Sequence, residues 1–221
     1  MNTYVMHYTP LKKRKAHIQT LFNDLNLYPE FVTKYDRDDL QEFSYVYIFN
    51  KNDWNRKINR IKEVLLKNIF YPKKKTFKSL LRYQMFYTLN RIFTPVWLQA
   101  RVLTPSEISL SYKHYFALKK ISEQSLPSLV VEDDVVSTEN TLELIHNAFN
   151  LCLDGFDYVD LGGIYNFPYL KNDIKLNNNS KFIALGIPRT NTTAAYMIAP
   201  KAAKILLKNI LPLTFPVDWQ Y

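Results

Sequence analysis

Three successive carboxylates, Glu132, Asp133 and Asp134, directly follow the apolar run Ser128–Val131. A continuous apolar run that ends in charge is typical of a strand buried on both faces of a parallel sheet. Adjacent carboxylates repel one another unless cations neutralise them. Ligands of open α/β sheets bind at the carboxyl ends of strands, and hard divalent cations share oxygen ligands between carboxylates and phosphates. The run therefore predicts either a metal–diphosphate site or a solvated acidic turn that caps the next helix.

Two basic side chains are further candidates for chemistry. Arg14 follows the first predicted strand, and a guanidinium matches phosphate oxygens bidentately. The alternative is a helix-surface arginine within the basic run Lys12–Lys15. His114 lies among aromatic residues in a predicted helix, where it is either an active-site residue or a structural histidine.

The elements that must position these residues begin with a strand at Thr3–Tyr8, a helix at Lys12–Leu25 and a second strand at Glu30–Lys34. Two strands that flank one helix open a βαβ unit, which is the usual start of a mostly parallel sheet. Thr104 with Glu107 three residues later forms a capping-box pattern, which predicts a helix from Pro105 to about Gln124. Further along we predict a helix at Thr138–Cys152, a strand at Tyr158–Leu161, a polar loop at Asn172–Ser180, strands at Lys181–Leu185 and Ala194–Ile198, and a helix at Pro200–Asn209.

Composition limits the class of protein. A chain of 221 residues that is 47% apolar and 15% aromatic can bury one sizeable core. The single cysteine, Cys152, cannot form an internal disulfide, so we expect a buried thiol and a reducing compartment. The histidines make no ligand set with this cysteine, which argues against zinc. No apolar run reaches the ~18 residues of a membrane span, and no leader pattern opens the chain. We therefore expect a soluble, cytoplasmic protein.

The charge of the chain is uneven. Its formal charge is +9, but Lys51–Arg101 carries thirteen basic residues against two acidic ones, so this segment sums to +11 and the rest to −2. Its apolar residues recur at helical spacing, which predicts a basic helical insertion at about 51–101. The helices either pack on the body with solvated lysines or form a peripheral contact with anionic lipid or a phosphorylated acceptor. Their aromatic residues follow helical stripes and form no stacking platform, so we expect no nucleic acid partner.

Five segments together resemble glycosyltransferase family 25, which includes lipopolysaccharide, lipooligosaccharide and collagen galactosyltransferases. Two of them are Leu103–His114 and Leu126–Val135, which are similar to the family's L-T-P-G-E-I-G-C-x-x-S-H and P-x-x-V-L-E-D-D-V. The opening Tyr4–Tyr8 with Arg14 resembles Y-V-I-N-L-D-R-R-x-x-R. Thr192–Ala203 resembles G-T-x-A-Y-x-I-S-x-x-x-A, and Pro216–Asp218 resembles P-x-D.

The resemblance implies an α/β fold with a GT-A-like nucleotide-sugar-binding sheet flanked by helices. It implies an inverting transfer of a hexose, with galactose favoured, from a UDP-sugar to a glycan or lipid-linked acceptor. Asp218 is then the expected catalytic base and His114 a second catalytic candidate. The expected donor-binding residues are Arg14, Glu132, Asp133 and Thr192, and the expected ligands of Mn²⁺ or Mg²⁺ are Asp134 and Asp133.

The chain also departs from the family pattern. The family's N-L-D is His7-Tyr8-Thr9, its two glycines are Ser106 and Ser109, and the serine before its histidine is Lys113. We expect one domain over 1–221 that lacks the C-terminal part of the family fold, because members usually continue past P-x-D. The alternative function is a non-catalytic module that binds an anionic partner or membrane through its basic helices.

Overall fold

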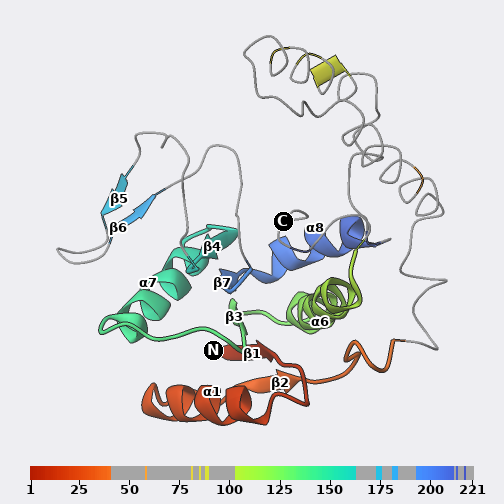
Figure 1. Ribbon diagram of the computed structural model, residues 1–221. Helices are drawn as coiled ribbons and strands as arrows, with labels where there is room; N and C mark the ends of the chain where they lie inside the picture. The colour runs from red at the N-terminus through yellow and green to blue at the C-terminus, as the bar shows by residue number, and fades with distance from the viewer. Residues whose placement is uncertain are drawn as a thin grey trace.

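The computed structural model describes residues 1–40, 103–162 and 193–211, the strands at 173–175 and 181–183, and a few single residues between and beyond them. Figure 1 shows the elements, which are β1 (Asn2–Met6), α1 (Lys12–Asp24), β2 (Glu30–Val32), α6 (Pro105–Ser122), β3 (Ser128–Glu132), α7 (Thr141–Leu153), β4 (Tyr158–Asp160), β5 (Asp173–Lys175), β6 (Lys181–Ile183), β7 (Ala195–Ile198) and α8 (Pro200–Ile210).

The main sheet has five strands in the order β2-β1-β3-β7-β4. β1 pairs in parallel with both β2 and β3, which confirms the βαβ opening. β7 runs antiparallel to its neighbours β3 and β4, so the sheet is mixed with a single reversed strand. Met6 of β1 pairs with Glu132 of β3, so these two central strands end at the same edge. The residues that follow these two strands in the chain therefore lie next to each other at this edge of the sheet.

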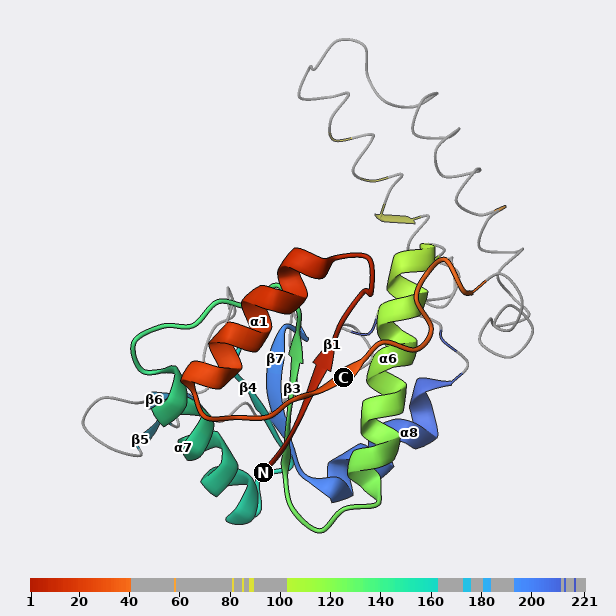
Figure 2. The same cartoon turned by 90° about the horizontal axis from the view of Figure 1, so that it is seen from below.

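Helices cover both faces of this sheet, as Figure 2 shows, with α1 and α7 on one side and α6 and α8 on the other. Alternate residues of each strand supply the two cores, since successive side chains of a strand point to opposite faces. Val5 and Leu129 pack with α1 and α7, whereas Met6 and Val130 pack with α6 and α8. Cys152 of α7 is buried in the first core, as predicted, and burial raises the pKa of its thiol to about 12.

The start of α6 is specified locally. The Thr104 hydroxyl accepts the Glu107 N–H at 3.3 Å, and the Glu107 carboxylate accepts the Thr104 N–H at 2.8 Å. This is the predicted capping box, and Pro105 at the first helical position completes it. One face of α6 then carries Ser106, Ser109 and Lys113, because residues three and four apart are neighbours on a helix.

Several predicted boundaries are wrong. The strands predicted at Thr3–Tyr8 and Glu30–Lys34 end earlier, at Met6 and Val32. α7 begins at Thr141 and not at Thr138, because the Thr141 hydroxyl accepts the Thr138 N–H at 2.7 Å in a turn that precedes the helix. The predicted loop at 172–180 contains β5, which pairs antiparallel with β6.

The predicted basic insertion lies largely outside the described residues; Ile58, Leu81, Met85 and Leu89 within it are helical and exposed. Among the described residues no helix is long and apolar enough to cross a membrane.

Candidate active site

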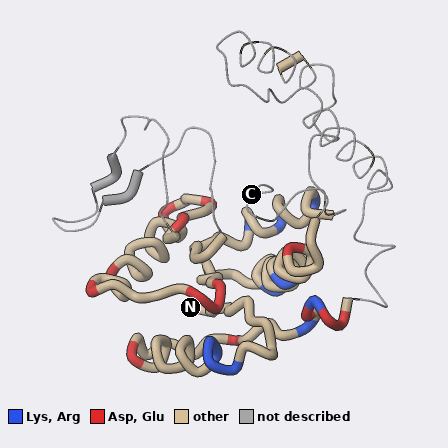
Figure 3. Tube along the Cα trace, in the orientation of Figure 1, with Lys and Arg blue, Asp and Glu red and all other residues tan. Residues whose placement is uncertain are grey.

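A pocket of about 230 Å³ opens where β1 and β3 end. The turn after β1, the acidic run after β3 and the first half of α6 form its walls. It is lined by Met6, His7, Tyr8, Leu11, Arg14, Arg37, Ser106, Ser109, Leu110, Lys113, Glu132, Asp133 and Asp134. Figure 3 marks the acidic run in red and the basic start of α1 in blue at this edge of the sheet. The carboxyl ends of parallel strands are where open α/β sheets bind ligands.

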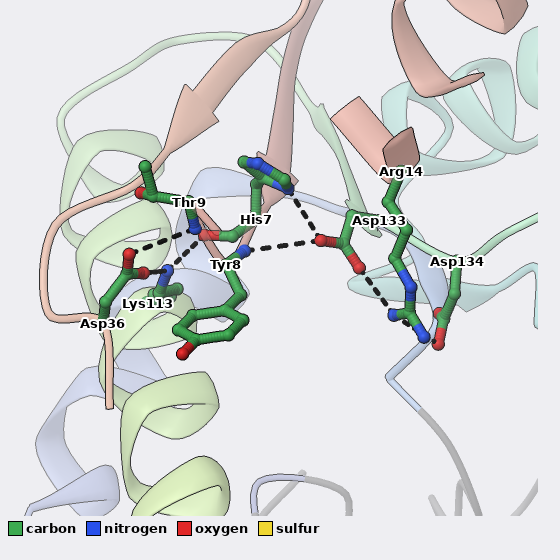
Figure 4. Close-up of polar contacts among 8 residues, drawn as sticks. All are labelled: His7, Tyr8, Thr9, Arg14, Asp36, Lys113, Asp133 and Asp134. Carbon is green, nitrogen blue, oxygen red and sulfur yellow. Dashed lines mark hydrogen bonds and ion pairs between the residues drawn. The ribbon is translucent and has the colours of Figure 1, made fainter. Parts of the chain in front are cut away.

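Asp133 connects the walls of the pocket. Its Oδ2 accepts from the His7 ring Nδ1 at 2.7 Å and from the Tyr8 N–H at 3.3 Å. Its Oδ1 accepts from the Arg14 guanidinium at 2.9 Å (Figure 4). The carboxylate is buried, so these bonds replace the water it lost on folding. Both oxygens of Asp133 are therefore committed to protein donors.

Arg14 joins the two aspartates that follow β3. The same guanidinium nitrogen that bonds to Asp133 donates to Asp134 Oδ2 at 3.1 Å. The hydrogen bond to Asp133 raises the pKa of Arg14 above its already high ordinary value, so the side chain is cationic at neutral pH. The side chains of Arg14 and Asp134 are 46% and 53% exposed. The structure thus places a positive charge, half open to solvent, at the ends of the central strands.

A second ion pair lies on the α6 side of the pocket. The Lys113 ammonium donates to the His7 carbonyl oxygen and to Asp36 Oδ1, and Asp36 Oδ2 accepts the Thr9 N–H at 3.1 Å (Figure 4). Burial alone would raise the pKa of the Asp36 carboxyl, but the bonds from Lys113 and Thr9 outweigh it and hold that pKa below its ordinary value. Asp36 is therefore ionised at neutral pH.

Glu132 lies on the remaining wall of the pocket, and His114 lies behind it. Glu132 Oε1 accepts the Thr193 hydroxyl at 2.8 Å and lies 3.9 Å from His114 Nε2. His114 Nδ1 shares a hydrogen bond of 2.9 Å with the Tyr196 hydroxyl. His114 is wholly buried, and burial lowers the pKa of its imidazole to about 3. It is neutral, and it lies behind Glu132 and not among the lining residues.

A sequence model described as "Glycosyltransferase family 25 (LPS biosynthesis protein)" matches residues 1–220. The chain belongs to glycosyltransferase family 25. This confirms the resemblance drawn from the five sequence segments and identifies the chain as a glycosyltransferase, whereas the non-catalytic alternative is not favoured. The mixed five-stranded sheet between helices is consistent with the GT-A-like fold that the resemblance implies. No curated protein matches the sequence.

The structure brings together four of the predicted site residues of this glycosyltransferase, namely Arg14, Glu132, Asp133 and Asp134. His114 reaches the site only through Glu132. Thr192 and Asp218 lie outside the described residues, so their roles stay predictions. Sequence reasoning did not select Tyr8, Asp36, Arg37, Lys113 or Thr193, which line or support the same pocket.

The predicted metal ligands do not form a prepared cation site in this arrangement. Asp133 has no oxygen without a protein donor, and Arg14 bridges it to Asp134. Within the described ranges, no three His, Cys, Asp or Glu side chains are grouped so that they would hold a metal ion. A requirement for Mn²⁺ or Mg²⁺ at Asp134 stays a prediction.

Proposed function

We propose that this glycosyltransferase moves a hexose, with galactose favoured, from a UDP-sugar to a glycan or lipid-linked acceptor in lipopolysaccharide biosynthesis. The observation that carries the proposal is Arg14, a half-exposed cation held by Asp133 and Asp134 at the edge of a strand-end pocket. A guanidinium binds phosphate oxygens in a bidentate geometry that suits a diphosphate. The description of the family as a lipopolysaccharide biosynthesis protein supports the choice of acceptor.

The two walls of the pocket suggest how the donor lies. We place the diphosphate beside Arg14, because the guanidinium offsets the negative charge of the phosphates. Arg14 is also exposed enough to turn toward a ligand. The nucleoside then extends toward Tyr8 and the α6 face with Ser106 and Ser109, which line the other end of the pocket. The Tyr8 ring offers the base a stacking surface, and the exposed Ser106 hydroxyl offers the ribose a hydrogen bond.

The reaction follows as a single displacement. A carboxylate base removes the proton of the acceptor hydroxyl as that oxygen bonds to the anomeric carbon of the sugar. The bond from the anomeric carbon to the diphosphate oxygen breaks at the same time, and the diphosphate leaves with the electron pair. Arg14 offsets the charge that grows on the leaving group, and such electrostatic stabilisation is typically the largest catalytic contribution. Asp218 is our candidate for the base, on the strength of its match to the family's P-x-D.

Isothermal titration of the folded protein with UDP, with and without Mn²⁺, tests the donor assignment. We expect binding at sub-millimolar UDP, and competition by UDP-galactose. No binding at millimolar UDP in either condition would contradict the proposal. A transfer assay with several UDP-hexoses then identifies the sugar.

We also propose a peripheral contact with anionic membrane through the basic insertion. Ile58, Leu81, Met85 and Leu89 are exposed and helical, and the last three recur at a spacing of four residues, which is the spacing of an amphipathic helix. The segment that contains them carries the whole excess of positive charge. Exposed apolar side chains in a basic segment favour the surface of an anionic bilayer, where a lipid-linked acceptor would be embedded.

Flotation with neutral and anionic vesicles at 0.1 M and 1 M salt tests this contact. We expect binding to anionic vesicles only, weakened at high salt because the Debye length falls from about 10 Å to about 3 Å. Replacing Lys73, Lys74 and Lys75 with Gln should weaken it by roughly 1 kcal/mol per charge and leave UDP binding unchanged. Equal or absent binding to both vesicle types would contradict the membrane contact but not the glycosyltransferase assignment.

A further inference from the structure

The turn at residues 7–9 is where the chain departs most from the family pattern, and Lys113 is a second departure far away in sequence. The structure joins the two. Lys113 Nζ bonds to the His7 carbonyl oxygen, and its ion-pair partner Asp36 accepts the Thr9 N–H. A carboxylate absent from the turn itself is thus supplied by the segment after β2, with a counter-ion from α6.

These bonds act on the two peptide groups that flank Tyr8. The His7 carbonyl and the Tyr8 N–H belong to the peptide before Tyr8, and they bond to Lys113 and Asp133. The Thr9 N–H belongs to the peptide after Tyr8, and it bonds to Asp36. Because a peptide group is planar, orienting both neighbours fixes φ and ψ of the residue between them. The direction in which the Cα–Cβ bond of Tyr8 leaves the backbone is therefore set by these three contacts.

Burial makes the Lys113–Asp36 pair expensive to keep. The exposed fractions of the two residues are 2% and 6%. Removing an ammonium and a carboxylate from water costs several kcal/mol per ion, and a buried pair is often no more stabilising than apolar side chains of the same volume. Stabilisation of the fold is thus a weak explanation for the presence of this pair. Holding the backbone of the turn at residues 7–9 in one conformation is a sufficient explanation.

We propose that Lys113 and Asp36 are positioning residues that hold Tyr8 as the wall on which the nucleoside of the donor rests. The inference rests on the proposed function, because it assigns Tyr8 a role toward the nucleotide. The Tyr8 ring lines the pocket, and the Arg37 guanidinium lies 4.5 Å from its centre. The Tyr8 hydroxyl donates to Asp38, so the ring is anchored at its far end as well.

The test is a mutational cycle on UDP affinity, measured by titration on variants shown to be folded by circular dichroism. We expect Tyr8→Ala to weaken UDP binding by about tenfold to hundredfold, the range seen when a stacking ring is removed. Lys113→Met combined with Asp36→Asn removes both charges and should weaken UDP binding by about tenfold or more, since a displacement of about 1 Å is enough for such losses. Combining all three changes should weaken binding no further than Tyr8→Ala alone, because the pair acts through Tyr8.

Lys120→Met is the matched control. It removes one charge from the same helix, where Lys120 pairs with Glu30 at the surface, and it should leave UDP binding unchanged. Lys113→Gln combined with Asp36→Asn is the second variant if the first double substitution does not fold, because it removes both charges, leaves neither ion unpaired and keeps an acceptor oxygen for Thr9. It should also raise the donor KM and leave the acceptor KM unchanged, which a general loss of stability would not do.

The outcomes separate the two proposals. Unchanged UDP affinity in the folded Lys113→Met/Asp36→Asn protein, or losses that add to that of Tyr8→Ala, would overturn the positioning role while the glycosyltransferase assignment stands. Failure of the unmodified protein to bind UDP would overturn the proposed donor, and with it the role assigned to Tyr8.

Discussion

The two halves of the pocket hold their charges in opposite ways. On the α6 side, the Lys113 and Asp36 side chains are 3% and 8% exposed and bond to each other and to the turn at residues 7–9. On the strand-end side, Arg14 and Asp134 are about half exposed. Water screens the second pair and leaves it little net energy, whereas the first pair is nearly dry. The buried half is therefore suited to fixing shape, and the open half to exchanging partners with a ligand.

The largest effect we expect is the loss of stability in Lys113→Met. The substitution leaves the buried Asp36 carboxylate without its counter-ion, and breaking a buried pair in this way costs about 3–5 kcal/mol. Urea denaturation followed by circular dichroism measures it. Lys120→Met, which breaks the exposed pair with Glu30, should cost less than about 1 kcal/mol. Equal losses in the two variants would remove the distinction between buried and open pairs.

The next effect is on acid stability and comes from His114, behind the open half. Burial lowers the pKa of its imidazole to about 3, so the unfolded chain, with a histidine pKa near 6.5, binds more protons below pH 6.5. The unfolding free energy should therefore decrease as the pH is lowered from about 6.5 to about 3, by up to about 1.4 kcal/mol per pH unit. The nearby Glu132 carboxylate, 3.9 Å away, would reduce that slope.

Asp36 contributes only at the acid end of this range. Its pKa is lowered in the folded protein, so its stabilisation is complete above about pH 4 and is lost only as the pH falls through its folded pKa. His114→Gln should thus flatten the stability profile between pH 6.5 and 4, where Asp36 does not contribute, and leave the Asp36 part of the loss below pH 4. An unchanged slope in this variant would show that another group carries the acid sensitivity.

The third effect is on ligand binding at the open half. Arg14→Gln should weaken UDP binding by about tenfold to hundredfold, because a hydrogen bond to a charged group contributes about 1.5–3 kcal/mol. Stability should fall by about 1–3 kcal/mol, because Arg14 is half exposed but the Asp133 carboxylate that loses its donor is buried. Lys13→Gln, on the same exposed helix start but outside the pocket, is the control for net charge. Equal UDP affinity in both variants would place the diphosphate elsewhere.

The sequence predicted those parts of the fold and site that have a local cause. The capping box at Thr104 specifies the start of α6, and the apolar run that ends in Glu132 specifies β3 and its acidic end. The strand β5 was missed because its residues Asp173–Lys175 are mostly polar and their only described sheet partner is β6. The sequence pattern of β5 alone does not show that it pairs with another strand.

The buried half of the pocket shows the same limit. Asp36 and Lys113 are 77 positions apart and read as surface residues, because burial of a charge depends on a partner that only the fold supplies. The available signal was that Lys113 and the turn at 7–9 both depart from the family pattern. These two departures from the family pattern are in contact in the structure and compensate for one another. Neither sequence position alone indicates this contact.

The smallest effect we expect is on stability in Asp134→Asn, and its value lies in testing the predicted cation. The side chain is 53% exposed and its bond to Arg14 is screened, so the unfolding free energy should change by no more than about 0.5 kcal/mol. If Asp134 holds Mn²⁺ beside the diphosphate, Mn²⁺ strengthens UDP binding in the unmodified protein and does not in this variant, while affinity in EDTA is the same in both. Glu139→Gln, at an exposed position after the acidic run, should behave as the unmodified protein. Equal UDP affinity of the unmodified protein in Mn²⁺ and in EDTA would contradict the metal prediction and leave Arg14 as the positive charge that the diphosphate meets.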